Sequence, residues 1–147
     1  MPKLLFFIPC ERVIVAREGP ISLITVLEGM NLNMPIEEYD SLPDDATAPI
    51  SWHVVTKWIA NDDEERHPWE QRLQVITPNG RISTELIMVF DLAENPVGIR
   101  NIAQINGFAI KPLGDVTIRL SLRRAGEDDT AWQEIATCPI KLQNPQP

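Results

Sequence analysis

The chain has few of the residues from which small catalytic and metal sites are usually built. Among its 147 residues are two cysteines and two histidines. Neither histidine belongs to a His-Glu-x-x-His motif or a Cys/His zinc spacing, and the chain has no Gly-x-Ser-x-Gly motif. It also has no glycine-rich loop that could hold a phosphate. We therefore expect a protein that is not an enzyme, binds no metal and needs no cofactor.

Positive charge is also scarce. The chain has 13 Lys and Arg residues against 21 Asp and Glu residues, which gives a formal net charge of −8. The one pair of adjacent basic residues is Arg123-Arg124. Proteins bind nucleic acids mainly through cations on the phosphates, so we expect no nucleic-acid partner. Binding to an anionic membrane is disfavoured for the same reason.

Long hydrophobic runs are absent as well. No apolar run approaches the roughly 18 residues of a membrane-spanning helix. The N-terminal apolar run, Leu4–Ile8, is shorter than the roughly 7–15 residues of a signal peptide, and Pro9 stands before Cys10 where a small residue is expected. We expect the first strand to begin close to residue 1. Cys10 and Cys138 fall in the first and last predicted strands, and we interpret them as buried free thiols of a cytoplasmic protein.

Proline is abundant, with 13 residues against seven glycines. Proline breaks helices and is common at strand ends and in loops, so this composition favours many short strands. Two apolar runs, Leu4–Ala16 and Ile21–Leu32, flank the turn Arg17–Pro20. They predict a first hairpin of two long antiparallel strands that forms the spine of the domain.

Apolar and alternating patterns predict the remaining strands over 50–60, 69–78, 82–92, 99–110, 114–124 and 131–142. Residues 85–92 could also form a helix, and we favour a strand because the neighbouring segments are strands. The acidic connection 33–49 is expected to be a surface loop with one short helical turn near 36–39. Gly107 and Glu134 interrupt their strands and predict local bulges or close backbone approach. The chain thus reads as a single all-β domain, 1–147: a two-sheet antiparallel β-sandwich of about eight strands, immunoglobulin-like or jelly-roll-like.

The tryptophans are the residues most open to a binding role. Trp52 and Trp58 share strand parity with aliphatic neighbours, which predicts the core. Trp69 and Trp132 start strands beside acidic loops, and we expect them to be partly exposed. Because sugars stack on open aromatic rings, Trp69 and Trp132 are candidate ligand-binding residues of a carbohydrate-binding module. A structural role for each is the alternative.

The acidic run Asp62–Glu65 precedes His67 and could suggest a metal site. Consecutive carboxylates on a loop usually repel one another and stay solvated, so we expect no metal there.

The first hairpin is apolar on both faces, with Leu4, Phe6 and Ile8 on one and Leu5, Phe7, Val13 and Val15 on the other. A strand of an isolated sandwich should have one face exposed to solvent. The second face is therefore covered, either by the 33–49 loop or by another subunit. We hypothesise self-association, as a homodimer or larger assembly, through this hairpin.

The run FIPCERVIVAREGPISLITVLEGMNL is followed by a loop that ends in proline, the strand ISWHVVTKW and a Pro-Asn-Gly turn. This order resembles a bacterial family of small β-sandwich proteins, a domain of unknown function. The resemblance implies the sandwich fold and a bacterial origin, and it carries no site residues. The leading interpretation is a soluble, non-catalytic binding or assembly module, with the carbohydrate-binding module as the alternative.

Overall fold

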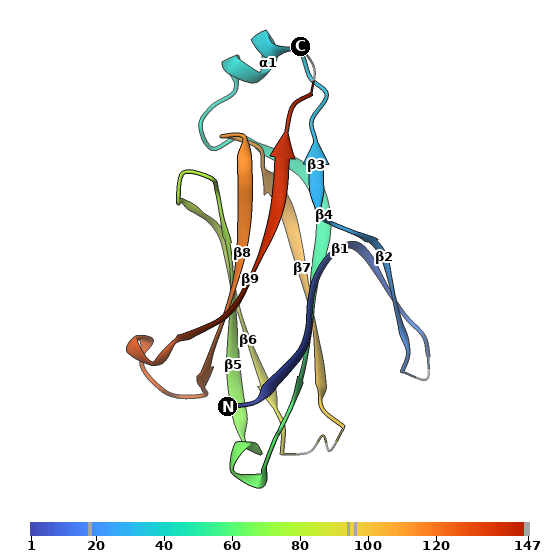
Figure 1. Cartoon of the computed structure of the whole chain (residues 1–147), viewed down its shortest axis with the longest axis vertical. Helices are drawn as coiled ribbons and strands as arrows, with labels where there is room; N and C mark the ends of the chain where they lie inside the picture. Colours follow the sequence, from blue (N-terminus) through green and yellow to red (C-terminus); the bar gives the residue numbers. More distant parts are fainter. Residues whose placement is uncertain (18, 94, 96, 146–147) are drawn as a thin grey trace.

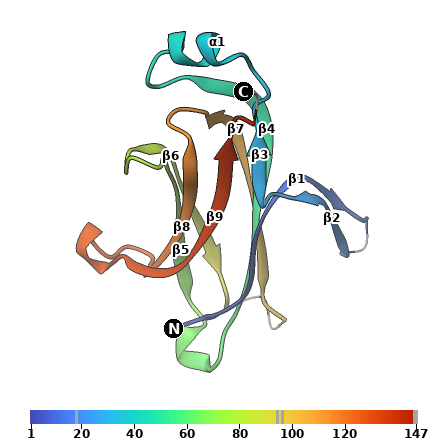
Figure 2. The same ribbon diagram turned by 45° about the horizontal axis from the view of Figure 1, so that its top comes forward.

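The structure is a computed structural model that describes residues 1–17, 19–93, 95 and 97–145. It is a sandwich of two packed sheets (Figures 1 and 2). The four-stranded sheet has the order β2-β1-β4-β7, and the five-stranded sheet has the order β3-β9-β8-β5-β6. The strands are β1 (Lys3–Val15), β2 (Ile21–Val26), β3 (Gly29–Asn31), β4 (Thr47–Ile59), β5 (Pro68–Ile76), β6 (Ile82–Asp91), β7 (Ile99–Ala109), β8 (Gly114–Arg124) and β9 (Gln133–Gln143). The predicted all-β two-sheet sandwich is confirmed.

Helical structure is limited to short pieces. The expected helical turn after the first hairpin is α1 (Ile36–Ser41), and two single 3₁₀ turns follow, η1 (Asp63–Glu65) and η2 (Asp129–Ala131). The buried Tyr39 anchors α1, because its hydroxyl donates to the carbonyl oxygen of Ile110 at 3.1 Å. None of the helices in the described ranges has the length and hydrophobicity needed to span a bilayer.

The core lies between the sheets. Trp52 and Trp58 enter it from β4, as predicted, with 1% and 0% of their surface exposed. The alternation in β8 is confirmed too, since Val116, Ile118, Leu120 and Leu122 are fully buried. These side chains remove a large apolar area from water, which is the main favourable term in folding.

One buried polar network crosses the core. The side-chain oxygen of Gln71 on β5 accepts hydrogen bonds from Thr56 Oγ1 (2.7 Å), Trp58 Nε1 (2.9 Å) and Asn101 Nδ2 (3.1 Å). The three donors belong to β4 and β7, in the opposite sheet. A single amide therefore ties the two layers together and satisfies three buried donors.

Both predicted bulges are present. Gly107 has a φ of 92°, and a Cβ there would lie 2.7 Å from Cγ2 of Thr47, so a larger residue would clash. It faces the register shift between Ala48 and Ser51 of β4. In β9, the register with β8 shifts between Leu120 and Ser121, next to the broken parity at Glu134.

The predicted second strand, Ile21–Leu32, is wrong in extent. It divides into β2 and β3, which lie in different sheets, and β3 runs parallel to β9. The chain crosses between the sheets at Leu27 and Glu28. Leu27 N donates to Pro9 O (2.9 Å) in the four-stranded sheet, and Glu28 O accepts from Lys141 N (3.1 Å) in the five-stranded sheet. The first hairpin is therefore not the spine of the domain, because β2 is a terminal strand.

Candidate binding surface

The first hairpin leaves the sandwich half-way along β1. Residues from Lys3 to Cys10 pair with β4, and the last pair is Cys10 with His53. From Cys10 to Val15 the strand pairs with β2 instead. Beyond Cys10 the hairpin thus has only two strands, and both ribbon views show it leaving the body of the molecule (Figures 1 and 2). We call residues 11–17 and 19–26 the arm.

Both faces of the arm carry aliphatic side chains. The pairs Arg12–Ile24 and Ile14–Ser22 share one face, and the pairs Val13–Leu23 and Val15–Ile21 share the other. Four arm residues are large, aliphatic and exposed: Ile14 (53%), Val15 (53%), Ile24 (39%) and Val26 (50%). An isolated two-stranded hairpin is at best marginally stable in water. The arm thus exposes the kind of surface that other proteins cover.

One side-chain hydrogen bond links the turn of the arm to the sandwich. Arg100 Nη1, at the start of β7, donates to Gly19 O at 2.9 Å. Within the turn, Ala16 N donates to Pro20 O (2.8 Å) and Gly19 N donates to Ala16 O (3.1 Å). The arm therefore has a closed turn and a defined direction relative to the sheet.

A groove of about 720 Å³ lies where the arm joins the sandwich. Its apolar lining includes Leu27, Met30, Leu32, Ile50 and Trp52. It is bounded by the base of the arm, the crossover to β3 and the bulged start of β4. The lining is mostly apolar and concave, as in many binding sites.

The polar groups of the groove mostly bind one another. Ser51 Oγ donates to Asn106 Oδ1 (2.7 Å), and Gln104 Nε2 donates to Ser51 Oγ (2.9 Å). His53 Nδ1 lies 3.1 Å from the carbonyl oxygen of Glu11. Among these contacts no nucleophile is paired with a base.

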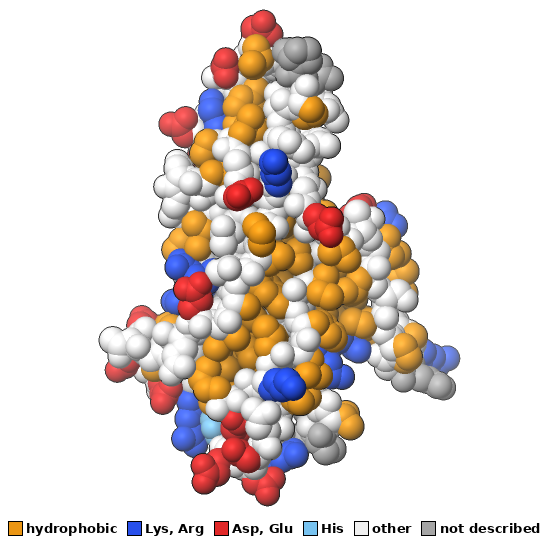
Figure 3. Space-filling view, viewed as in Figure 1, with side chains coloured by type: hydrophobic (Ala, Val, Ile, Leu, Met, Phe, Trp, Pro, Cys, Tyr) orange, Lys and Arg blue, Asp and Glu red, His pale blue; other side chains and the backbone are white. Residues whose placement is uncertain are grey.

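Charge and apolar surface are separated on the face shown in Figure 3. Hydrophobic side chains run along the centre of this face, between β9 and β1, and continue onto the hairpin. Acidic side chains lie mostly around the margin of this face, at its two ends and along one side. Contact through the centre of this face would bring little like charge together.

Trp69 is not partly exposed as we expected. Only 8% of its surface is accessible, its Nε1 donates to Glu65 O at 2.9 Å, and its ring stacks on His67 with centroids 4.5 Å apart. Trp69 shares a face of β5 with the buried Gln71 and Leu73, and this position outweighs the acidic loop beside it. Trp69 thus offers no open ring face to a sugar.

Trp132 is half-buried, and two cations lie over its ring. The guanidinium carbons of Arg72 and Arg123 are 4.6 Å and 4.2 Å from the ring centroid. Such cation–π contacts occupy the surface on which a sugar would stack. Trp69 and Trp132 do not form a shared platform, and the carbohydrate alternative rests on Trp132 alone.

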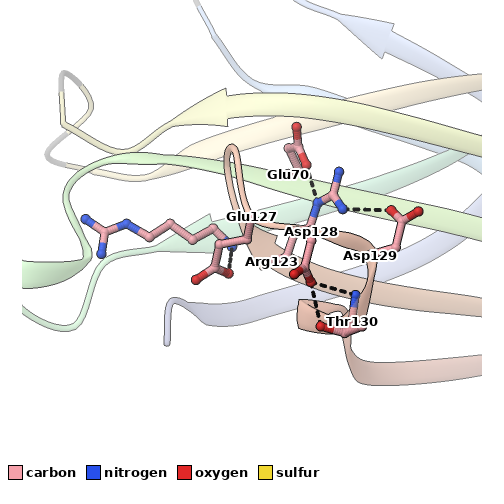
Figure 4. Close-up of polar contacts among 7 residues, drawn as sticks. Glu70, Arg123, Glu127, Asp128, Asp129 and Thr130 are labelled. Carbon is pink, nitrogen blue, oxygen red and sulfur yellow. Dashed lines mark hydrogen bonds and ion pairs between the residues drawn. The ribbon is translucent and has the colours of Figure 1, made fainter.

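Figure 4 shows the polar cluster around Arg123. Arg123 bonds the carboxylate of Glu70 and, at 3.0 Å, that of Asp129; the Glu70 hydrogen bond is the main cause of its raised pKa. Asp128 accepts from Thr130 Oγ1 (2.5 Å) and Thr130 N (2.9 Å), and these bonds lower its pKa. The cluster fixes η2 beside Trp132, which is a structural role.

The acidic run before His67 is also structural. Asp62 Oδ1 accepts from Glu65 N (3.1 Å) and caps η1. Burial raises the pKa of Glu65, but hydrogen bonds from the Met1 ammonium and the Asn61 amide outweigh it and hold the pKa below its ordinary value. Across the residues that the structure describes, no group of three His, Cys, Asp or Glu side chains could hold a metal.

The two cysteines are free, as predicted. Cys10 is buried at the base of the arm on β1, and Cys138 is partly buried on β9, in the other sheet. Burial raises the pKa of both thiols, so they are poor nucleophiles at neutral pH.

No protein-family model, curated protein or solved structure matches this chain. The resemblance to a bacterial sandwich family therefore stays a prediction.

Sequence analysis found the hairpin but missed the groove. Its lining joins residues far apart in the chain, such as Met30, Trp52 and Gln104. Within the apolar run 21–32, the sequence contained one local signal of the crossover between the sheets. Gly29 lies where a Cβ would come within 3.2 Å of Lys141 O, so an interior Glu-Gly pair marks the crossover between sheets.

Proposed function

We propose that this protein is a non-catalytic assembly module whose copies associate through the arm. The observation that carries the proposal is the exposure of four aliphatic side chains on a ribbon that only two strands support. Exposed apolar surface of this kind marks interaction sites in soluble proteins. The free, high-pKa thiols support a cytoplasmic setting.

The charge distribution favours a second copy over a polyanion. The sequence 11–26, which includes the arm, contains two acidic and two basic residues, so the formal charge of −8 lies on the rest of the chain. A neutral arm can meet its own copy without bringing like charges together. The distant acidic surfaces still repel one another, and salt screens that repulsion.

The test compares two lysine substitutions by size-exclusion chromatography with light scattering. Ile24→Lys places a charge on an exposed face of the arm, and Val89→Lys places one at a more exposed aliphatic position on β6. We expect wild type and Val89→Lys to form dimers at concentrations where Ile24→Lys is monomeric. Equal masses for all three proteins would contradict the proposal.

A further inference from the structure

In the described part of the chain the two sheets end in four terminal strands, and β2 is the one with neither a charged residue, a proline nor a very short length. Natural proteins protect sheet edges by charged residues, proline or short length. β7 carries Arg100, β6 carries Glu85 and Asp91, and β3 has three residues. β2 has the sequence ISLITV, with no charge and no proline. Its edge from Ile21 to Ile24 is the one best suited to receive another strand, since the φ of 56° at Thr25 interrupts the extended backbone beyond it.

We infer that β2 of one chain pairs edge to edge with β2 of a second copy. This inference rests on the proposed association through the arm and specifies its geometry. A two-fold axis perpendicular to the strands makes two copies of one strand antiparallel, which gives a closed, symmetric dimer. The pairing would join the two four-stranded sheets into one continuous sheet.

The groove at the base of the arm fits this arrangement. In an antiparallel pair, the turn end of β2, at Ile21, lies opposite the other end of its copy, at Val26. The residues that precede Ile21 then reach the partner's Leu27, which follows Val26 and lines the groove. The exposed Pro20 is the residue nearest to that position. Each groove would receive Pro20 of the other copy.

The surface area of the chain agrees with one missing partner. The accessible surface is 8332 Å². A compact monomer of 16.6 kDa is expected to expose about 7,600 Å², so this chain exposes roughly 700 Å² more. A stable interface buries about 800 Å² on each partner. The excess thus corresponds to one side of a dimer interface of ordinary size.

Packing of the exposed arm faces, without edge pairing, is the competing geometry. It would bury the same aliphatic side chains but leave the outer backbone amides of β2 in contact with solvent. Hydrogen exchange separates the two, because it reports the pairing of backbone N–H groups. The experiment follows the full chain by mass spectrometry at concentrations above and below the dimer midpoint.

We expect the outer amides of β2 to exchange about tenfold more slowly in the dimer, while those of β6 do not change. A dimer with unchanged β2 amides would overturn edge pairing and leave association through the arm intact. A chain that is monomeric at every concentration would overturn both.

Cross-linking tests whether the partner is a second copy. Ser22→Cys lies on β2, and Glu85→Cys is its control at an exposed position on β6. With a short bismaleimide, we expect linked dimers from Ser22→Cys and none from Glu85→Cys or wild type, whose thiols are at least partly buried. Equal linkage in the three proteins, or linkage only through Glu85→Cys, would overturn the inference.

Discussion

The body of the sandwich and the arm have similar side chains and opposite surroundings. In β8, Ile118 and Leu120 are fully buried, because strands flank them on both sides and a sheet covers them. In the arm, Ile14 and Ile24 are 53% and 39% exposed, because the ribbon has two strands and no second layer on that face. A run of aliphatic residues thus indicates that a strand is covered, but it does not say by what.

The largest expected effect is a loss of stability in the body of the sandwich, with the arm unchanged. Gln71→Leu removes the acceptor of three buried donors and leaves Thr56, Trp58 and Asn101 without it. Because each unsatisfied buried donor is costly, we expect the free energy of unfolding to fall by about 3 kcal/mol or more in urea titrations.

Gln104→Leu is the matched control for Gln71→Leu. Gln104 is exposed on β7, so its loss should change stability by less than about 0.5 kcal/mol. Similar losses for the two variants would show that the network does not hold the sheets together.

The second-largest expected effect is on the pH dependence of the stability of the sandwich body. The pKa of Glu65 is lowered in the folded state, so its contribution to stability is present at neutral pH and is lost as pH falls through that lowered pKa. Glu65→Gln should lower stability at neutral pH by about 1.5–3 kcal/mol and flatten the acid side of the stability profile.

Urea titrations at several pH values between 3 and 7 measure this effect. The range covers the ordinary carboxyl pKa of about 4 and the neutral region above it. Glu64→Gln is the control, since Glu64 is exposed next to Glu65 in η1. An unaltered acid profile in Glu65→Gln would mean that other carboxyl groups determine the acid sensitivity of the body.

The smallest effect concerns the link between the two regions. Arg100→Ala removes the hydrogen bond to Gly19 O and should free the turn of the arm. One hydrogen bond contributes about 0.5–1.5 kcal/mol, so we expect trypsin to cleave after Arg17 roughly twofold to tenfold faster. Arg81→Ala, at an exposed arginine in a turn of the body, should leave that rate unchanged.

The sandwich could be predicted because strand alternation records burial on one face. The pattern in β8 and the parity of Trp52 and Trp58 follow directly from this rule. The division of β2 from β3 could not be predicted in the same way. Hydrophobicity is continuous through Leu27, and only the backbone bonds of Leu27 and Glu28 to different sheets reveal the crossover.

Only part of the candidate site could be predicted, because the sequence shows hydrophobic patterns but not how distant segments meet. The apolar faces of the hairpin are visible in the sequence, whereas the groove depends on how β3 and β4 lie beside the base of the arm. Two residues were misjudged from neighbouring charge. The acidic loop suggested that Trp69 was exposed and Glu65 solvated, but the cap at Asp62 folds the loop so that both are buried.

Association through the arm is the central claim, and sedimentation equilibrium of the unmodified chain tests it most directly. The account predicts a mass that rises with concentration from 16.6 kDa towards twice that value, with the rise abolished by Ile24→Lys. A mass that stays at 16.6 kDa up to the highest soluble concentration would contradict it.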